Sequence, residues 1–187
     1  MVKKEIRVIG IDDGPFDKFK EKESIVVGVV TRGGTFVEGI LSSKVDIDGD
    51  NSTKVFINLI NNSKFKPQLQ CIFLNGIAVG GFNVVDIKEL NKKTKIPVAV
   101  IIRQNPNIAK IKETLEKLKQ KKKSRLIDKA GKVTKINDIY IQSAGIEIEK
   151  LKEILKVVCT RSNIPEPLRL AHIIATGIVK GESRGKA

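Results

Sequence analysis

Residues 24–47, SIVVGVVTRGGTFVEGILSSKVDI, decide the fold of this chain. The stretch begins with a run of β-branched side chains, and its last part alternates apolar and polar residues. The tetrapeptide RGGT between these parts is typical of a tight turn, so we predict an antiparallel hairpin with a bulge at Gly39. The apolar residues 6–11 predict one more strand, so the chain opens with three antiparallel strands.

Strands alternate with helices in the rest of the chain. Residues 69–74 and 97–102 are continuous apolar runs, which are typical of buried parallel strands. Apolar side chains recur at helical spacing over residues 108–118 and predict an amphipathic helix that starts at Asn105-Pro106. The other expected elements are helices over residues 52–61, 84–90, 148–158 and 165–179, a strand or hairpin over residues 133–141, and a basic loop over residues 119–125.

This order of elements predicts an α/β fold with one mixed sheet, its first three strands antiparallel, and helices on both faces. We expect a single domain over residues 1–180 and a flexible tail over residues 181–187, which contain Gly, Ser and Lys. The length of 187 residues suits one domain, and a hydrophobic content of 41% excludes an intrinsically disordered chain.

Membrane insertion and secretion have no support in the sequence. No stretch approaches the roughly 20 apolar residues that a membrane-spanning helix needs, and the N-terminus carries no apolar signal segment. We therefore expect a soluble, cytoplasmic protein. Cys71 and Cys159 lie in apolar surroundings and are interpreted as reduced core thiols, because a zinc site needs more ligands than these and the single His172.

The charge balance is the first indication of a partner. The chain has 28 Lys, 7 Arg and a net charge of +14, which favours nucleic acid or another anionic surface. A Lys-rich composition suited to high temperature is the alternative explanation. Candidate phosphate contacts lie in the basic segment at Lys119, Lys121, Lys122, Lys123 and Arg125. Such a run can instead be a solvated helix face and loop.

Acidic residues follow several of the expected strands. Asp12 and Asp13 end the first strand, Asp48 and Asp50 end the third, and Asn75 ends the fourth. If the first and fourth strands are neighbours, these ends converge at one edge, where oxygen ligands would suit Mg²⁺. The alternative for Asp48 and Asp50 is ordinary turn chemistry around a glycine.

A second candidate group opens the last helix. Two prolines fix its start, Arg169 and His172 are three residues apart on one face, and Glu166 precedes them. The group could orient a water or hold a phosphate. Alternatively, His172 only flanks a core stripe of apolar residues. No glycine-rich nucleotide-binding pattern is present, so we expect no nucleotide cofactor.

Three blocks of sequence resemble a known family. Residues 9–16 (IGIDDGPF), 75–86 (NGIAVGGFNVVD) and 164–172 (IPEPLRLAH) resemble the archaeal endonuclease dU family, and the first and last blocks also resemble endonuclease V. The resemblance implies a ribonuclease H-like fold with a mixed five-stranded sheet. It also implies an endonuclease of DNA repair, dependent on Mg²⁺ or Mn²⁺, that cleaves deaminated DNA containing uracil or hypoxanthine.

The same resemblance assigns roles to individual residues. Asp12 would be a catalytic metal ligand, His172 would stand where endonuclease V has Asp or His, and Asp48 or Asp50 would supply the remaining acidic ligand. Asn75 would occupy a position where the family pattern usually has Asp, and an amide oxygen is the weaker ligand for a hard dication. Either Asp13 or Asp86 compensates, or the protein binds nucleic acid with weakened or lost catalysis. DNA is the expected partner, with RNA as a second candidate and Arg169 as a further phosphate contact.

Overall fold

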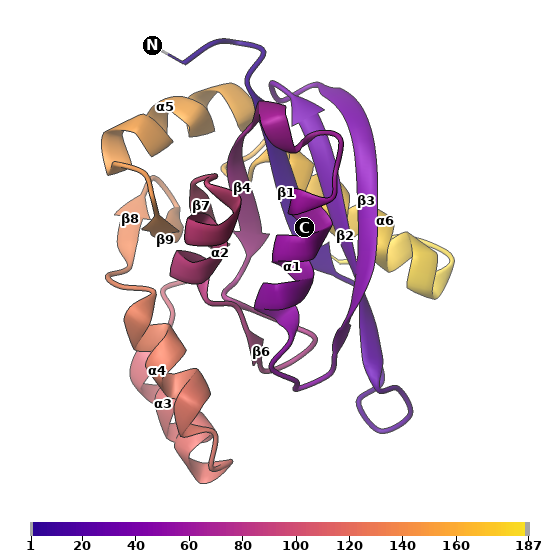
Figure 1. The fold of residues 1–187 in the computed structure, drawn as a ribbon, viewed down its shortest axis with the longest axis vertical. Helices are drawn as coiled ribbons and strands as arrows, with labels where there is room; N and C mark the ends of the chain where they lie inside the picture. The colour runs from indigo at the N-terminus through magenta and orange to yellow at the C-terminus, as the bar shows by residue number, and fades with distance from the viewer. Residues whose placement is uncertain (1, 186–187) are drawn as a thin grey trace.

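The computed structural model describes residues 2–185, and a seven-stranded mixed sheet forms its centre (Figure 1). The strand order is β3-β2-β1-β4-β7-β9-β8. β1, β2 and β3 are antiparallel to one another, whereas β4 runs parallel to β1 and β7 parallel to β4. The strands are β1 (Arg7–Asp13), β2 (Glu23–Arg32), β3 (Phe36–Asp46), β4 (Leu69–Asn75), β7 (Val98–Ile102), β8 (Thr134–Ile136) and β9 (Ile139–Ala144).

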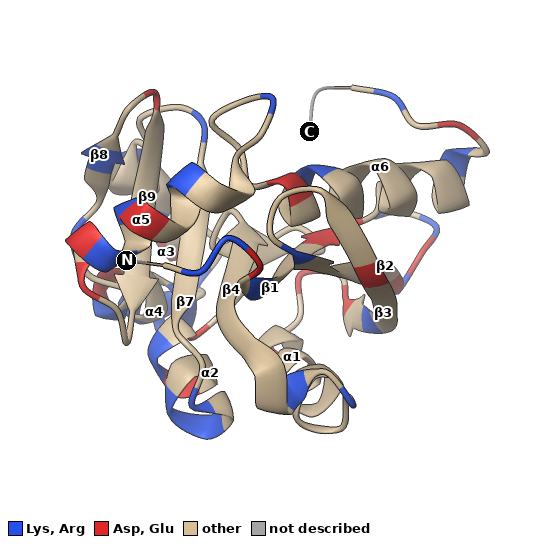
Figure 2. Cartoon of the chain, turned by 90° about the horizontal axis from the view of Figure 1, so that it is seen from above, with Lys and Arg blue, Asp and Glu red and all other residues tan. Residues whose placement is uncertain are grey.

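Helices cover both faces of this sheet, as the sequence predicts (Figure 2). Phe56 of α1 and Leu90 of α2 belong to the core on one face, and Leu151 of α5 and Leu168 of α6 belong to the core on the other. The remaining short elements are η1 (Lys66–Gln68), β5 (Ala78–Val79) and β6 (Asn83–Val84). The helices are α1 (Ser52–Asn61), α2 (Ile87–Thr94), α3 (Ile108–Lys117), α4 (Lys121–Lys129), α5 (Ile148–Val158) and α6 (Glu166–Lys180).

The structure corrects three details of the sequence prediction. The sheet has seven strands instead of five, because the β8–β9 hairpin extends it beyond β7. The expected basic loop is the helix α4, whose buried Ile127 packs in a small core with Leu115 of α3. The helix α3 is capped by Asn107 and not by Asn105, since the Asn107 side chain accepts the backbone N–H of Lys110.

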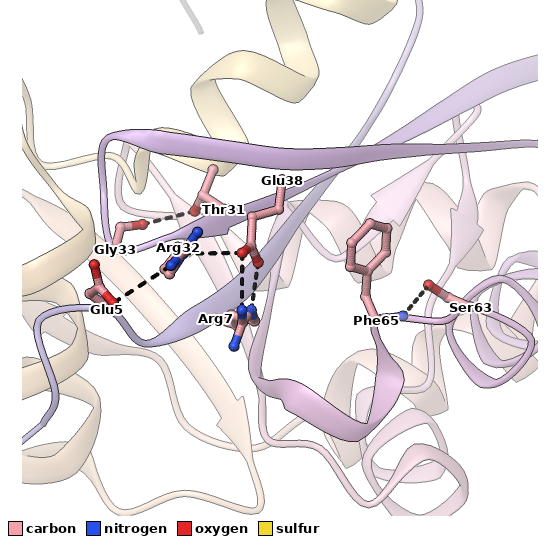
Figure 3. Close-up of polar contacts among 8 residues, drawn as sticks. All are labelled: Glu5, Arg7, Thr31, Arg32, Gly33, Glu38, Ser63 and Phe65. Carbon is pink, nitrogen blue, oxygen red and sulfur yellow. Dashed lines mark hydrogen bonds and ion pairs between the residues drawn. The ribbon is translucent and has the colours of Figure 1, made fainter.

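A bulge in β3 fixes the register of the three antiparallel strands. The pairing of β2 with β3 skips Glu38, beside the predicted position at Gly39. The Glu38 carboxylate accepts two hydrogen bonds from Arg7 at 2.5 and 3.0 Å and pairs with Arg32 at 3.1 Å (Figure 3). Hydrogen bonding to Arg7 lowers the pKa of Glu38. Gly39 lies next to Glu38 on β3. The ring of Phe65 occupies the space that a side chain at Gly39 would need.

The helix α6 lies directly against β1 because Gly10 has no side chain. A Cβ atom at Gly10 would lie 2.5 Å from the carbonyl carbon of Pro167 and 2.6 Å from the Cα of Leu168. Those are backbone atoms of the first turn of α6, so they cannot rotate away. The missing side chain therefore lets the backbone of α6 contact the backbone of β1 directly. This contact sets the distance between α6 and β1, and His172 lies about one turn further along α6.

Several expectations concern features away from the sheet. No helix within residues 2–185 is long and apolar enough to cross a membrane. Cys71 and Cys159 are free cysteines, and burial raises the pKa of each thiol to about 12. The predicted flexible tail lies partly outside the described residues, at 186–187. Its first residue, Gly181, adopts a left-handed conformation and caps α6.

Candidate active site

The carboxyl ends of β1 and β4 open into a cavity of about 350 Å³. Because these two strands are parallel neighbours, Asp12 at the end of β1 and Asn75 at the end of β4 come together, and α6 adds His172. The sequence prediction that these three residues share one site is consistent with this geometry. The full lining is Asp12, Asp13, Gly14, Pro15, Phe16, Asn75, His172, Thr176, Lys180 and Arg184.

Asp12 is the centre of the polar network in this cavity. Its side chain is 2% exposed, and its Oδ2 atom accepts the amide of Asn75 at 3.0 Å and contacts Nδ1 of His172 at 2.8 Å. Oδ1 accepts the backbone N–H of Asp13 at 3.0 Å. Because an ionised carboxylate only accepts hydrogen bonds, this contact assigns a proton to Nδ1 of His172. In the neutral ring, Nε2 then carries the lone pair, and Nε2 is buried with no hydrogen-bond partner among the described residues.

Asp13 supplies a second carboxylate beside Asp12. Its Oδ2 atom accepts the backbone N–H of Gly80 at 2.9 Å. Burial, together with the nearby charge of Asp12, raises the pKa of Asp13 to about 6. Burial also raises the pKa of Asp12, against the opposing effect of its hydrogen bonds from Asn75 and His172. A cation would stabilise the ionised forms of these two neighbouring carboxylates, of which Asp12 is buried and Asp13 is half-buried.

The donor set fits a divalent cation that keeps part of its water. Asp12, Asp13 and Asn75 offer oxygen atoms, and Mg²⁺ in proteins is typically held by one or two carboxylates with water and phosphate oxygens. Within residues 2–185, no group of three or more Asp, Glu, His or Cys side chains is placed so that it could hold a metal ion. The cavity offers two carboxylates and one amide oxygen, so water and substrate would have to supply the remaining ligands of a cation bound there.

Asp48 and Asp50 do not line this cavity. The Oδ1 atom of Asp48 accepts the backbone N–H of Phe82 at 2.8 Å, and its φ of 54° places it in a left-handed turn. Asp50 lies 3.7 Å from the ammonium of Lys123. The structure therefore places Asp48 in a turn and does not bring Asp48 or Asp50 into the cavity with Asp12.

Asp86 is the other candidate for replacing the carboxylate that Asn75 lacks, but it makes its contacts outside the cavity. Its side chain caps α2 by accepting the backbone N–H of Glu89, and it pairs with Lys129. Asp13 is thus the acidic residue that accompanies Asp12 at the cavity.

The basic residues predicted to contact nucleic acid have different surroundings. Lys119, Lys121, Lys122 and Arg125 are exposed on α4 and the turn before it, away from the cavity lining. Lys123 differs from its neighbours, because its side chain is only 5% exposed and its ammonium donates to the carbonyl of Asp48 at 2.6 Å. Figure 2 shows that Lys and Arg are spread over separate elements, including α2, β8 and the end of α6.

The end of the chain contributes cations that the sequence prediction missed. Lys180 and Arg184 line the cavity, and Arg184 also donates to Glu182 at 2.6 Å. The predicted Arg169 forms a bidentate pair with Glu166 at 2.5 and 2.9 Å. Thr176 and Lys180 follow His172 at intervals of four residues on α6, which places all three on one face. That periodicity was the signal by which Lys180 could have been found.

The strand order and the helices on both faces of the sheet define a ribonuclease H-like fold. Among solved structures, endonuclease V from Ciona intestinalis, in complex with DNA containing an inosine, matches with a TM-score of 0.61 and 16% identity over 94% of this chain and 86% of that one. A crystal structure of a protein of unknown function from Archaeoglobus fulgidus matches with a TM-score of 0.87 and 39% identity, over 94% of this chain and 99% of that one.

Sequence comparison gives the family. A UPF0215 protein of Methanothermobacter thermautotrophicus is 45% identical over 191 residues, covering 100% of this chain and 94% of its own length. The endonuclease dU family model matches residues 4–179. The chain belongs to the endonuclease dU family.

Proposed function

We propose that the protein is an endonuclease that requires Mg²⁺, or Mn²⁺ in its place, and cleaves phosphodiester bonds in deaminated DNA containing uracil or hypoxanthine. The observation that carries this proposal is the convergence of Asp12, Asp13, Asn75 and His172 on one open cavity. Family membership supports a nuclease, and the likeness to an endonuclease V bound to inosine-containing DNA supports a deaminated base. Such an enzyme would act in DNA repair.

Six residues of the cavity would take part in this chemistry. Asp12, Asp13 and Asn75 would hold the cation, which would act as a Lewis acid toward the phosphate. Asp12 also fixes the ring of His172 through Nδ1, so that the lone pair on Nε2 can accept a proton from the attacking water. Lys180 and Arg184 at the cavity bind the phosphate oxygens of the strand.

The exposed cations of α4 extend this contact. Lys119, Lys121, Lys122 and Arg125 would bind the DNA backbone beyond the cavity, without reading its sequence. Their contribution to affinity would fall with rising salt, because each phosphate contact releases counterions.

A nicking assay on uracil- and hypoxanthine-containing duplexes with Mg²⁺ tests the proposal. We expect His172→Ala to lower the rate about 100-fold or more, the size typical of a lost general base. Asp12→Asn should also lower the rate, because it removes a carboxylate ligand of the cation and the partner of His172 Nδ1. Asp50→Asn is the matched control, because it removes an exposed carboxylate outside the cavity and should leave the rate unchanged. Equal rates for Asp12→Asn and the unmodified chain would remove Asp12 from the mechanism.

A second candidate function is DNA binding with weakened or lost catalysis. The hydrogen bond from Asn75 to Asp12 favours it, because this bond satisfies the carboxylate without a metal. This function predicts salt-sensitive DNA affinity that EDTA does not change, with no cleavage. The variant Asn75→Asp separates the two candidates, since cutting gained in the variant and absent before would show that the site lacks a ligand.

A further inference from the structure

The loop between β1 and β2 carries an aromatic ring that nothing in the described chain covers. Phe19 is 88% exposed, the highest value among the large hydrophobic residues of the described chain. The loop begins with Gly14, Pro15 and Phe16, which line the candidate active site. Figure 1 shows the loop projecting beyond the end of the sheet, at the lower right. The exposed ring is therefore carried on a segment that starts inside the cavity wall.

Hydrogen bonds hold this loop in a defined turn. The Asp17 carboxylate accepts the backbone N–H of Phe19 at 3.0 Å. The Asp17 carbonyl accepts the N–H of Lys20 at 3.0 Å and that of Glu21 at 2.8 Å. The turn keeps the ring at the tip of the loop, although an exposed phenyl group forgoes the hydrophobic stabilisation that burial would give.

The charge nearest the ring indicates the chemistry of its partner. The ammonium of Lys18 lies 5.2 Å from the centroid of the Phe19 ring. Lys20 and Lys22 follow in the same loop, but they alternate with Asp17 and Glu21, and Lys20 pairs with Asp17. An aromatic face beside an ammonium group matches one nucleotide, whose base stacks on the ring while its phosphate meets the cation. An acidic or neutral protein surface would match only one of these two features.

We propose that Phe19 stacks on an unpaired base of the DNA strand that enters the cavity. The proposal rests on the proposed function for its substrate, but it adds a residue and a preference. A base inside a perfect duplex has both faces covered by its neighbours, so stacking on Phe19 requires a base that has left the helix. The protein therefore prefers DNA with an unpaired or mispaired base over a perfectly paired duplex.

Binding of single-stranded DNA that carries 2-aminopurine, a base whose fluorescence falls on stacking, tests this proposal without any need for cleavage. We expect Phe19→Ala to weaken binding about 5- to 100-fold and to abolish the fluorescence change, as loss of one base–aromatic contact does. Phe19→Trp should retain both. Because the side chain is exposed, these variants should keep the melting temperature of the parent protein.

Phe36→Ala provides the matched control. Phe36 is 55% exposed and has the guanidinium of Arg32 5.0 Å from its ring centroid, but it lies at the β2–β3 turn and does not line the cavity. Unchanged binding by Phe19→Ala, or an equal loss in Phe36→Ala, overturns the stacking proposal and leaves the nuclease proposal standing. Loss of binding in Phe19→Ala alone, in a protein that never nicks DNA, supports stacking and overturns the nuclease proposal.

Discussion

The contact between Gly10 and α6 predicts a large effect from a single added methyl group. In Gly10→Ala, the new Cβ would fall about 1 Å short of the ordinary contact distance of 3.4 Å to the backbone of Pro167 and Leu168. Neither strand nor helix can relieve the overlap by a side-chain rotation. The helix must therefore move away from β1, and His172 moves with it.

The magnitude follows from the cost of overpacking. Forcing extra atoms into a packed core typically costs about 1–3 kcal/mol, and a backbone-to-backbone clash places this variant at about 3 kcal/mol. For a domain of this size, that corresponds to a fall in melting temperature of about 6–12 °C. A shift of about 1 Å also lengthens the contact of 2.8 Å between His172 Nδ1 and Asp12 Oδ2 beyond good hydrogen-bond geometry.

Thermal unfolding and the NMR signals of the ring nitrogens of His172 measure both effects. His172 is the single histidine of the chain, so its signals need no assignment among several rings. Gly28→Ala is the matched control, because its Cβ would meet side-chain atoms of Ile9 and Ile11 and no backbone, the nearest being the tip of Ile9 at 3.0 Å. It should cost about 1 kcal/mol or less. If Gly10→Ala has the same melting temperature as Gly28→Ala and its His172 signals do not shift, then Gly10 does not set the position of α6.

Three further predictions concern stability. Lys123→Met should cost about 1–3 kcal/mol in urea unfolding by leaving the carbonyl of Asp48 unpaired, whereas Lys122→Met, at an exposed neighbour, should cost almost nothing. The metal-free protein should lose stability as pH rises from about 4 to about 6, because the folded state holds the proton of Asp13 more tightly than the unfolded chain does. Asp13→Asn should flatten that slope in urea midpoints measured across the same range, and an unchanged slope would contradict the raised pKa. Glu38→Gln should lower the urea midpoint by removing the charge shared by two arginines, with a smaller loss at high salt, and a loss independent of salt would exclude an electrostatic cause.

Local patterns in the sequence were enough to predict most of the sheet. The hairpin at residues 24–47 needs only β-branched residues, alternation and a glycine turn, and the buried parallel strands need only continuous apolar runs. The meeting of Asp12 and Asn75 then follows, because the carboxyl ends of parallel neighbours share one edge. The helix α4 escaped prediction because its many lysines resemble a loop, and tertiary contacts decide that Lys123 and Ile127 are buried.

The finer composition of the site depends on contacts that composition and spacing do not encode. Sequence alone offered Asp13, Asp48, Asp50 and Asp86 as partners for Asp12. In the fold, Asp48 accepts the backbone N–H of Phe82, and Asp86 pairs with Lys129. The sequence does not show either contact. Likewise, no local pattern distinguishes the exposed Phe19 from the other phenylalanines, because burial is set by the strands that each one meets.

Anomalous scattering from a crystal soaked in Mn²⁺ locates the bound cation independently of activity. We expect a peak in contact with the carboxylates of Asp12 and Asp13. If the protein nicks DNA with Mn²⁺ while its crystals show the ion only at Asp48 and Asp50, or show none at the end of β1, the end of β1 is not the metal site.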